Sequence, residues 1–237
     1  MGSVGVTWQN IADEITASLA ERGLDVVHPF QVGWYNGQMR PSARCLPDLG
    51  RATALGLVIG NTREFWPLFL RALEHYEHLQ SESDPVDRYA VDSVLSALSV
   101  LELRWLVRWA HELEPEPLPI QRVARATGLA TLSPSHLSVH PTHGPWIALR
   151  AVVIVDVDGP DGEAPDCHDH CTGCAKPCVE ALQRALDATD ITPDAAAVER
   201  DWASWVSVRD ACPIGQSSRY SDEQIRYHYT KLRQLLC

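Results

Sequence analysis

The residues best suited to chemistry in this 237-residue chain are its cysteines. Four of the seven lie close together, at Cys167, Cys171, Cys174 and Cys178, and a fifth, Cys212, precedes a proline. Thiols at such short intervals can turn toward one centre, and the small residues Gly173 and Ala175 let the backbone wrap around it. Because secreted proteins with a disulfide framework spread their cysteines along the chain, this cluster predicts metal binding instead.

Three interpretations of the cysteine cluster are open. A [4Fe–4S] iron–sulfur cluster needs three close cysteines and a fourth, which is often followed by proline. The spacing Cys171-x2-Cys174-x3-Cys178 resembles the end of a bacterial ferredoxin motif, and Cys167, Cys171 and Cys174 with the remote Cys212 form an equally good set. A structural zinc site would draw its four ligands from the same cysteines and from His168 or His170. The third interpretation is a set of thiols without metal.

The composition excludes several classes of protein. The formal net charge is −11, and a general binder of nucleic acid or of anionic membranes needs clustered basic residues, so neither partner is expected. The most apolar run, 148–155, is far shorter than the roughly 20 residues of a membrane span. The N-terminal segment lacks the basic and apolar regions of a signal peptide, so we expect a cytoplasmic protein.

The elements that must position the cysteines alternate without a regular βαβ period, which predicts an α+β fold. Helices are predicted at 7–23, 63–80, 85–98, 120–130, 179–189, 194–206 and 221–236, from apolar periodicity and capping residues. Strands are predicted at 25–34, 54–59, 136–140 and 146–156, the last two as a hairpin, whereas 101–109 fits either a helix or a strand. We expect a core over residues 1–160 and a cysteine-rich, mainly helical segment over residues 161–237 that completes the same domain.

Five segments, in order along the chain, resemble the CblC family of cytosolic proteins that process cobalamin. They are Pro29–Asn36, Asp84–Asp87, Leu137–Arg150, Val208–Asp210 and Arg219–Gln224. The resemblance implies a flavin-reductase-like or nitroreductase-like core that binds cobalamin in its base-off form. It also implies removal of the upper axial ligand, by reductive decyanation with reduced flavin or by transfer of an alkyl group to the thiolate of glutathione. The cysteine cluster departs from this family and is similar to the ferredoxin-like motifs of epoxyqueuosine reductases.

The resemblance and the chemistry of the ligand together select binding residues. A corrin is a broad, mostly apolar plate rimmed by amides, so its pocket needs flat side chains and hydrogen-bonding groups. The candidates for this role are Gln31, Trp34, Tyr35, Asn36, His140, Trp146 and Arg150. Arg209 and Arg219 are candidates for the carboxylates of the thiol substrate, although an ion pair with Asp222 or Glu223 is the structural alternative for Arg219. No catalytic residue is predicted.

These observations predict a cobalamin-binding protein that reductively removes the upper axial ligand, with an iron–sulfur cluster as the electron relay. Zinc is the alternative metal, FMN is a further cofactor compatible with the core, and a thiol or an electron-donor protein is the expected partner. Two other functions stay open. One is a non-catalytic cobalamin carrier with a structural zinc site, and the other is a flavin-dependent reductase of a different substrate.

Overall fold

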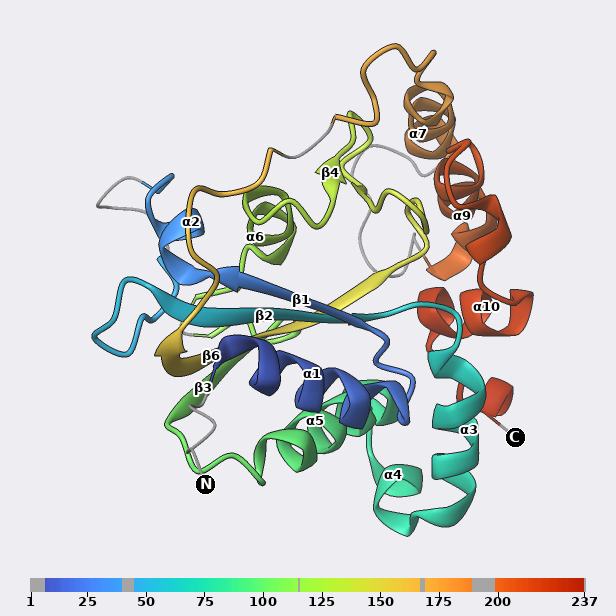
Figure 1. Cartoon of the computed structure of the whole chain (residues 1–237). Coiled ribbons are helices and arrows are strands. Elements are labelled where there is room, and N and C mark those ends of the chain that lie inside the picture. The colour runs from blue at the N-terminus through green and yellow to red at the C-terminus, as the bar shows by residue number, and fades with distance from the viewer. Residues whose placement is uncertain (1–6, 40–44, 115, 167–168, 189–198, 237) are drawn as a thin grey trace. The chain divides into compact units, whose positions relative to one another are not determined.

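The computed structural model of the chain describes residues 7–39, 45–114, 116–166, 169–188 and 199–236 (Figure 1). The chain divides into two compact units. The first comprises Met1–Leu129 and Ala148–Cys167, and the second comprises Ala130–Ile147 and His168–Cys237. This division differs from the predicted boundary between residues 160 and 161, because residues 130–147 group with the C-terminal residues. The prediction that both parts belong to one domain stays a prediction.

The first unit is built on a four-stranded antiparallel sheet in the order β1-β2-β6-β3. Its strands are β1 (Val26–Gln31), β2 (Ala54–Asn61), β6 (Ala148–Asp158) and β3 (Trp105–Trp109). Every residue of β2 is buried, as are residues 151–155 of β6. These two central strands therefore bury both faces, which explains why they are continuous apolar runs without polar alternation.

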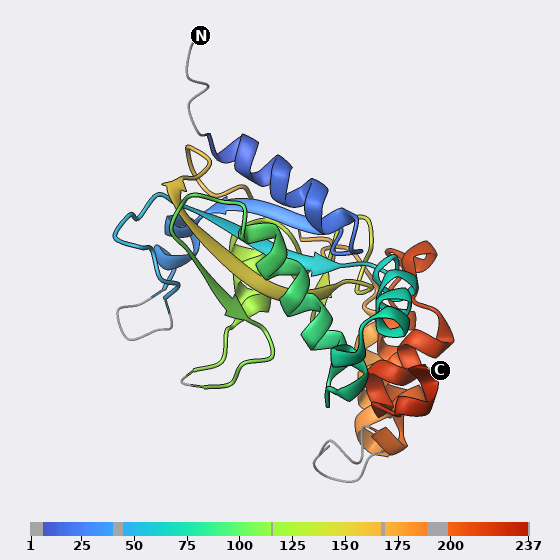
Figure 2. The ribbon, with the colours of Figure 1, turned by 90° about the horizontal axis from the view of Figure 1, so that it is seen from below.

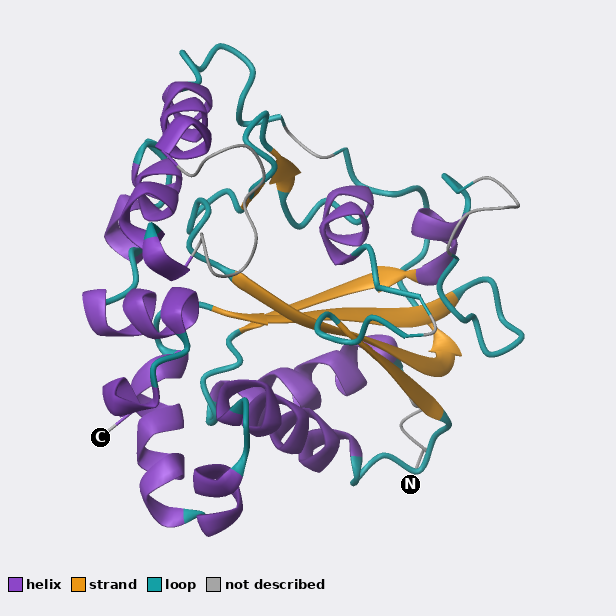
Figure 3. Cartoon of the chain, turned by 180° about the vertical axis from the view of Figure 1, so that it is seen from behind, coloured by secondary structure: helices purple, strands orange, loops and turns teal. Residues whose placement is uncertain are grey.

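Helices cover both faces of this sheet, as Figures 1 and 3 show. On one face lie α1 (Trp8–Ala20) and α5 (Pro85–Leu98), and on the other lie α2 (Val32–Asn36) and α6 (Ile120–Ala126); Figure 2 views the first pair from below. The apolar stripe of α1 is buried, and Asp84 caps α5 by accepting a hydrogen bond from the Asp87 amide. The mixed α+β class is thus confirmed.

The helix predicted at 63–80 is two helices, α3 (Phe65–His75) and α4 (Glu77–Ser81). They are separated by Tyr76, whose backbone is extended and whose side chain is 55% exposed. The predicted single helix is therefore wrong at Tyr76, because the chain leaves the helical conformation at that residue. The ambiguous segment 101–109 forms β3 from Trp105 onward.

The hairpin predicted between 136–140 and 146–156 is also wrong. The short strand β5 (Ser138–Val139) pairs with β4 (Thr131–Leu132), and only a single bridge joins His140 to Gly144. Strand β6 starts at Ala148 and forms its hydrogen bonds with β2 and β3. Because both edges of β6 are occupied within the sheet, it has no edge left for the preceding segment.

The second unit is mainly helical, with α7 (Pro177–Ala188), α9 (Trp202–Asp210), α10 (Asp222–Thr230) and the 3-10 turns η1 (Gln216–Ser218) and η2 (Arg233–Leu236). Of the helix predicted at 194–206, residues 194–198 lie outside the described residues, and α9 continues to residue 210. Ser221 caps α10 as predicted, but the helix ends early because Lys231 adopts a left-handed conformation, with φ 53°. No helix in the described ranges is long and apolar enough to cross a membrane.

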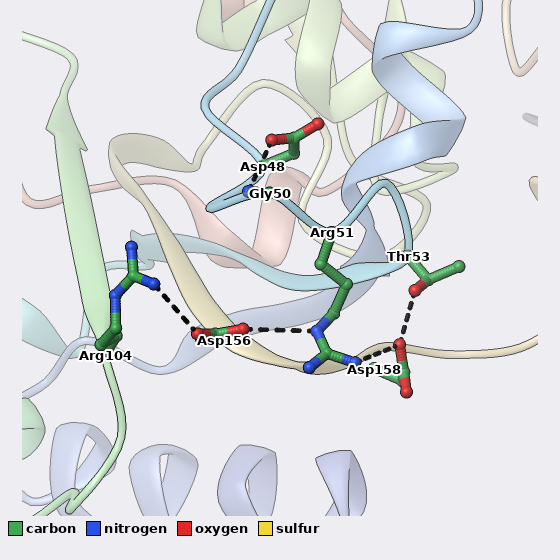
Figure 4. A network of polar contacts seen from close by, with 7 residues as sticks. All are labelled: Asp48, Gly50, Arg51, Thr53, Arg104, Asp156 and Asp158. Carbon is green, nitrogen blue, oxygen red and sulfur yellow. Dashed lines mark hydrogen bonds and ion pairs between the residues drawn. The ribbon is translucent and has the colours of Figure 1, made fainter.

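A network of charged side chains joins strand ends in the first unit (Figure 4). Arg51, which precedes β2, contacts Asp156 at 3.3 Å and Asp158 at 3.0 Å, and Arg104, which precedes β3, contacts Asp156 at 3.5 Å. Hydrogen bonds from Thr53 and then Arg51 lower the pKa of Asp158. Because most of these groups face solvent, the network fixes the strand ends with a modest, salt-screened stabilisation.

The partly buried imidazole of His28 should make the folding stability depend on pH. Its Nε2 lies 2.8 Å from the Thr127 carbonyl oxygen, and burial lowers the pKa of the imidazole below its ordinary value. The unfolded chain therefore takes up a proton first as the pH falls through about 6.5, and the folded state loses stability. We expect urea unfolding to show a larger loss between pH 7.5 and 5.5 for the wild type than for His28→Gln. Equal losses in the two proteins would contradict this role.

Candidate functional site

Four cysteine thiols line one cavity in the second unit, namely those of Cys171, Cys174, Cys178 and Cys212. The rest of the wall is largely apolar, with Leu137, Val139, Pro145, Pro177, Pro213 and Ile214, and it includes His170, Lys176, Ser133 and Ser135. The enclosed volume is about 20 Å³, and the space reaches about 410 Å³ when the open mouth is included. A void that holds about one water molecule cannot enclose a corrin, so cobalamin does not bind inside this cavity.

Three parts of the chain bring these thiols together. Cys171 and Cys174 lie in the loop before α7, Cys178 lies in the first turn of α7, and Cys212 follows the end of α9. The two helices pack side by side, with Cys178, Ala181, Ala185 and Val208 in one buried cluster. The small alanine side chains allow a close approach of the helices, and this approach places Cys212 near the first turn of α7.

The position of Cys212 depends on a close contact between two backbone segments. A Cβ atom on Gly144 would overlap the Ile214 carbonyl oxygen, and one on Gly215 would overlap the His143 carbonyl group. Both glycines also have positive φ, 56° and 72°. Only glycine satisfies both conditions, so the turn at His140–Gly144 holds the segment that follows Cys212.

Hydrogen bonds to the sulfur atoms favour the thiolate form, whereas burial and neighbouring groups favour the protonated thiol. The Lys176 amide donates to the Cys174 sulfur at 3.3 Å, and the Ile214 amide donates to Cys212. Burial, followed by Asp169 and the neighbouring thiols, raises the pKa of Cys171, and burial also raises the pKa of Cys212. These two thiols are therefore protonated at neutral pH when no cation is present, which argues against a free thiolate nucleophile.

Of the remaining cysteines, only Cys45 belongs to the described residues. Cys45 is exposed, and no cysteine in the described ranges is in a disulfide. Cys167, a predicted ligand, and His168 lie outside the described residues. Among the residues that the structure describes, no three His, Cys, Asp or Glu side chains converge closely enough to hold one metal ion. The four thiols thus surround the cavity without converging on a single point.

The four N-terminal candidates for corrin binding make contacts within the first unit. The predicted extended segment 25–34 ends at Gln31, whose Nε2 donates to the Pro160 carbonyl at 3.0 Å, and the helix α2 follows. Trp34 Nε1 donates to the Gly162 carbonyl at 3.0 Å, and Tyr35 is fully buried. The amide of Asn36 both donates to and accepts from the Leu46 backbone. These contacts hold loops in place, and a role in binding stays a prediction.

Trp146, Arg209 and Arg219 form a stack in the second unit. Trp146 is buried among Val206, Tyr220 and Ile225, so its ring belongs to a core. The guanidinium groups of Arg209 and Arg219 lie 5.9 and 5.5 Å from its ring centroid, a cation–π arrangement.

Both arginines of this stack are also engaged in hydrogen bonds. Arg209 donates to the Pro145 carbonyl. Arg219 pairs with Asp210 and Asp222, each at 2.7 Å, and these bonds raise the pKa of its guanidinium. Binding of a thiol substrate by these arginines stays a prediction.

His140 and His143 are the imidazoles of the turn before Trp146. Their rings stack with centroids 4.9 Å apart. The Nδ1 of His140 accepts from the amides of Thr142 and His143, so Nε2 carries the proton in the neutral ring, and His143 Nδ1 lies 2.9 Å from the Ser218 hydroxyl. His140 is thereby oriented by its own turn.

Arg150 is held at the N-terminal part of β6 in the first unit. Its Nε donates to the buried Asn61 amide oxygen at 2.8 Å, its Nη1 contacts Asp87 at 3.2 Å, and it lies over the Phe65 ring. Its Nη2 is buried and has no hydrogen-bond partner among the described residues. Sequence reasoning missed Asn61, because nothing in the local pattern of an apolar strand reveals a partner 89 residues away.

Comparison with known proteins finds relatives that carry the same name. No family model matches the chain. The cyanocobalamin reductase / alkylcobalamin dealkylase of Bos taurus is 26% identical over 246 residues, which are 95% of this chain and 80% of that protein. The protein of the same name from Homo sapiens is 27% identical over 95% of this chain and 79% of its own length.

A solved structure of the C. elegans B12-trafficking protein CblC matches 96% of this chain and 94% of that chain, with a TM-score of 0.69 and 19% identity. The chain is similar to the CblC proteins. A solved epoxyqueuosine reductase matches 91% of the CblC-like chain and 68% of its own, with a TM-score of 0.51 and 15% identity, so the two share a fold. The resemblance inferred from the sequence is confirmed.

The contact between Gly144 and Ile214 yields a stability prediction. Gly144→Ala adds a strained left-handed residue, which costs about 1–2 kcal/mol, and an overlap with backbone, which costs about 1–3 kcal/mol more. Gly162→Ala is the matched control, because Gly162 has φ 89° and open space around the position of a Cβ. Chemical unfolding should show a larger loss for Gly144→Ala, and equal losses would show that the contact does not hold this turn.

Proposed function

We propose that this CblC-like chain binds cobalamin and removes its upper axial ligand. The proposal rests on relatives named cyanocobalamin reductase / alkylcobalamin dealkylase that align with about 95% of the chain. The four-stranded antiparallel sheet with helices on both faces is compatible with the flavin-reductase-like or nitroreductase-like core that the sequence implies. The place of action in this proposal is the cytoplasm.

The chemistry of the proposed reaction is a reduction at cobalt. One electron converts cobalt(III) to cobalt(II), which weakens the bond to the upper ligand, and cyanide leaves as the anion with the bonding pair. For an alkyl ligand, a substrate thiolate attacks the carbon and forms a thioether. The cobalt–carbon bond breaks, and both of its electrons stay on cobalt. Bound water competes for the axial position, so apolar and aromatic walls favour the reaction.

Several residues of the chain suit parts of this task. Within the described part of the chain, the buried Nη2 of Arg150 has no acceptor, and an amide oxygen at the rim of a corrin would satisfy it. His140 presents a protonated Nε2 from a turn whose backbone is fixed by the Gly144 contact. Arg209 and Arg219 are the proposed partners of a substrate carboxylate, with Arg219 already shared between two aspartates.

The proposed electron source is an iron–sulfur cluster bound by cysteines of the second unit. Such a cluster, when bound, accepts and donates single electrons at low potential. An external electron-donor protein would supply them, with dithionite as its substitute in the test tube. The cavity lined by four thiols supports this part of the proposal, and FMN would act in it as a soluble reductant.

The test of cobalamin binding and turnover is an absorption experiment on the full chain purified without oxygen. Addition of hydroxocobalamin should shift the corrin bands to the base-off position, and cyanocobalamin with a reductant should convert to the cobalt(II) spectrum faster than without protein. An unchanged corrin spectrum would overturn the proposal. A shift without turnover would favour a carrier, and a yellow protein that leaves the corrin unchanged would favour a flavin-dependent reductase of another substrate.

The relay role predicts a defect that is specific to electron delivery. Cys171→Ser/Cys174→Ser should lower the rate of decyanation at limiting reductant at least about tenfold, while the base-off shift is retained, because cobalamin does not enter the thiol cavity. Cys45→Ser is the control, since Cys45 is exposed and outside that cavity. Equal rates in the double variant and the wild type would exclude a relay through these cysteines.

A further inference from the structure

Of the five cysteines that the structure describes, it brings four to one cavity. Those at 171, 174, 178 and 212 line one cavity, although Cys212 lies 34 residues beyond Cys178 in the sequence. Two of the predicted ligand sets, with and without Cys167, were equally good from spacing alone. The packing of α7 against α9 brings Cys178 and Cys212 into the wall of the same cavity.

The surroundings of these thiols suit a thiolate-bound metal centre. Amide groups of Lys176 and Ile214 donate to two of the sulfurs, which stabilises sulfur that carries negative charge. Lys176 also lines the cavity and offers a positive charge within a chain of net charge −11. Leu137, Val139 and Pro145 make much of the wall apolar, so few polar groups there compete with a metal for the sulfurs.

The arrangement of the thiols favours a centre with several metal atoms. A single zinc ion requires four sulfurs at about 2.3 Å from one point. In a [4Fe–4S] cluster each thiolate binds a different iron, so the sulfurs stand around a larger core. The four thiols line one cavity with an open mouth, and Cys171, Cys174 and Cys212 are partly exposed whereas Cys178 is buried.

We propose that Cys171, Cys174, Cys178 and Cys212 are the four ligands of one [4Fe–4S] cluster. This inference deepens the proposed function, because it names the site from which electrons would reach cobalamin. The loop 171–176 supplies two ligands, α7 supplies the third from its first turn, and the segment held by the Gly144 contact supplies the fourth. Cys45 and Cys167 take no part in it.

The test measures metal content in full-length variants, independently of activity. The anaerobically purified chain, reconstituted with ferrous iron and sulfide, should hold about four iron and four sulfide per chain and show a broad absorbance that dithionite bleaches. Single Cys→Ser changes at each of the four positions should lower the iron content at least about twofold. Cys45→Ser and Cys167→Ser are the matched controls and should keep the wild-type content.

The outcomes separate this inference from the function on which it rests. Loss of iron in Cys167→Ser, or full iron content in any one of the four variants, overturns the ligand set. One zinc per chain, or no metal, overturns the cluster. The base-off shift with hydroxocobalamin is recorded on the same samples. A variant that lacks iron and still shifts the corrin spectrum is folded. A wild-type protein that binds iron without shifting the corrin spectrum contradicts the cobalamin function alone. Cys178→Ala repeats the test at the buried position without placing a hydroxyl there.

Discussion

The close approach of two backbone segments, at Gly144 and at Gly215, is the contact on which the second unit depends. Each glycine has a positive φ and lies where a side chain would overlap the other segment. This contact fixes the turn that carries His140 and His143, and it fixes the residues directly after Cys212. The imidazole pair and one wall of the thiol cavity are therefore positioned by the same few backbone atoms. This explains how the segment 213–215, which has no regular secondary structure, can hold Cys212 in place.

The thiol cavity shows how a polar function can be placed in an apolar environment. Its wall is built from aliphatic and proline side chains, while backbone amides of Lys176 and Ile214 provide the hydrogen bonds that the sulfurs accept. Burial raises the pKa of Cys171 and Cys212, so without a cation these thiols stay neutral and unreactive. A bound cation, as proposed, would reverse this preference because its charge would stabilise the thiolates, and it would also link the loop, α7 and the end of α9.

Many of the side chains that the sequence offers for binding cobalamin also hold the fold together. Asn36 uses both ends of its amide on Leu46, Tyr35 and Trp146 are buried, and Arg219 bridges two aspartates. The arginine and aromatic character of these residues was evident from the sequence. Their partners were not, because Pro160, Gly162 and Asp210 become neighbours only through the tertiary fold. The Nη2 of Arg150 is a buried donor that finds no acceptor among the residues that the structure describes, so it has hydrogen-bonding capacity to spare there.

The sequence by itself determined the features that arise within a few residues. The apolar stripe of α1, the caps at Asp84 and Ser221, the apolar strand β2 and the cysteine cluster were all predictable, because helical periodicity, capping and close spacing are local. The ordered segments along the whole chain also determined the CblC-like family. The tertiary structure alone decided that β6 pairs with β2 and β3 instead of forming a hairpin, and that Cys178 and Cys212 share a cavity. These outcomes depend on competition between distant segments for the same strand edge or helix face, and no local pattern contains that information.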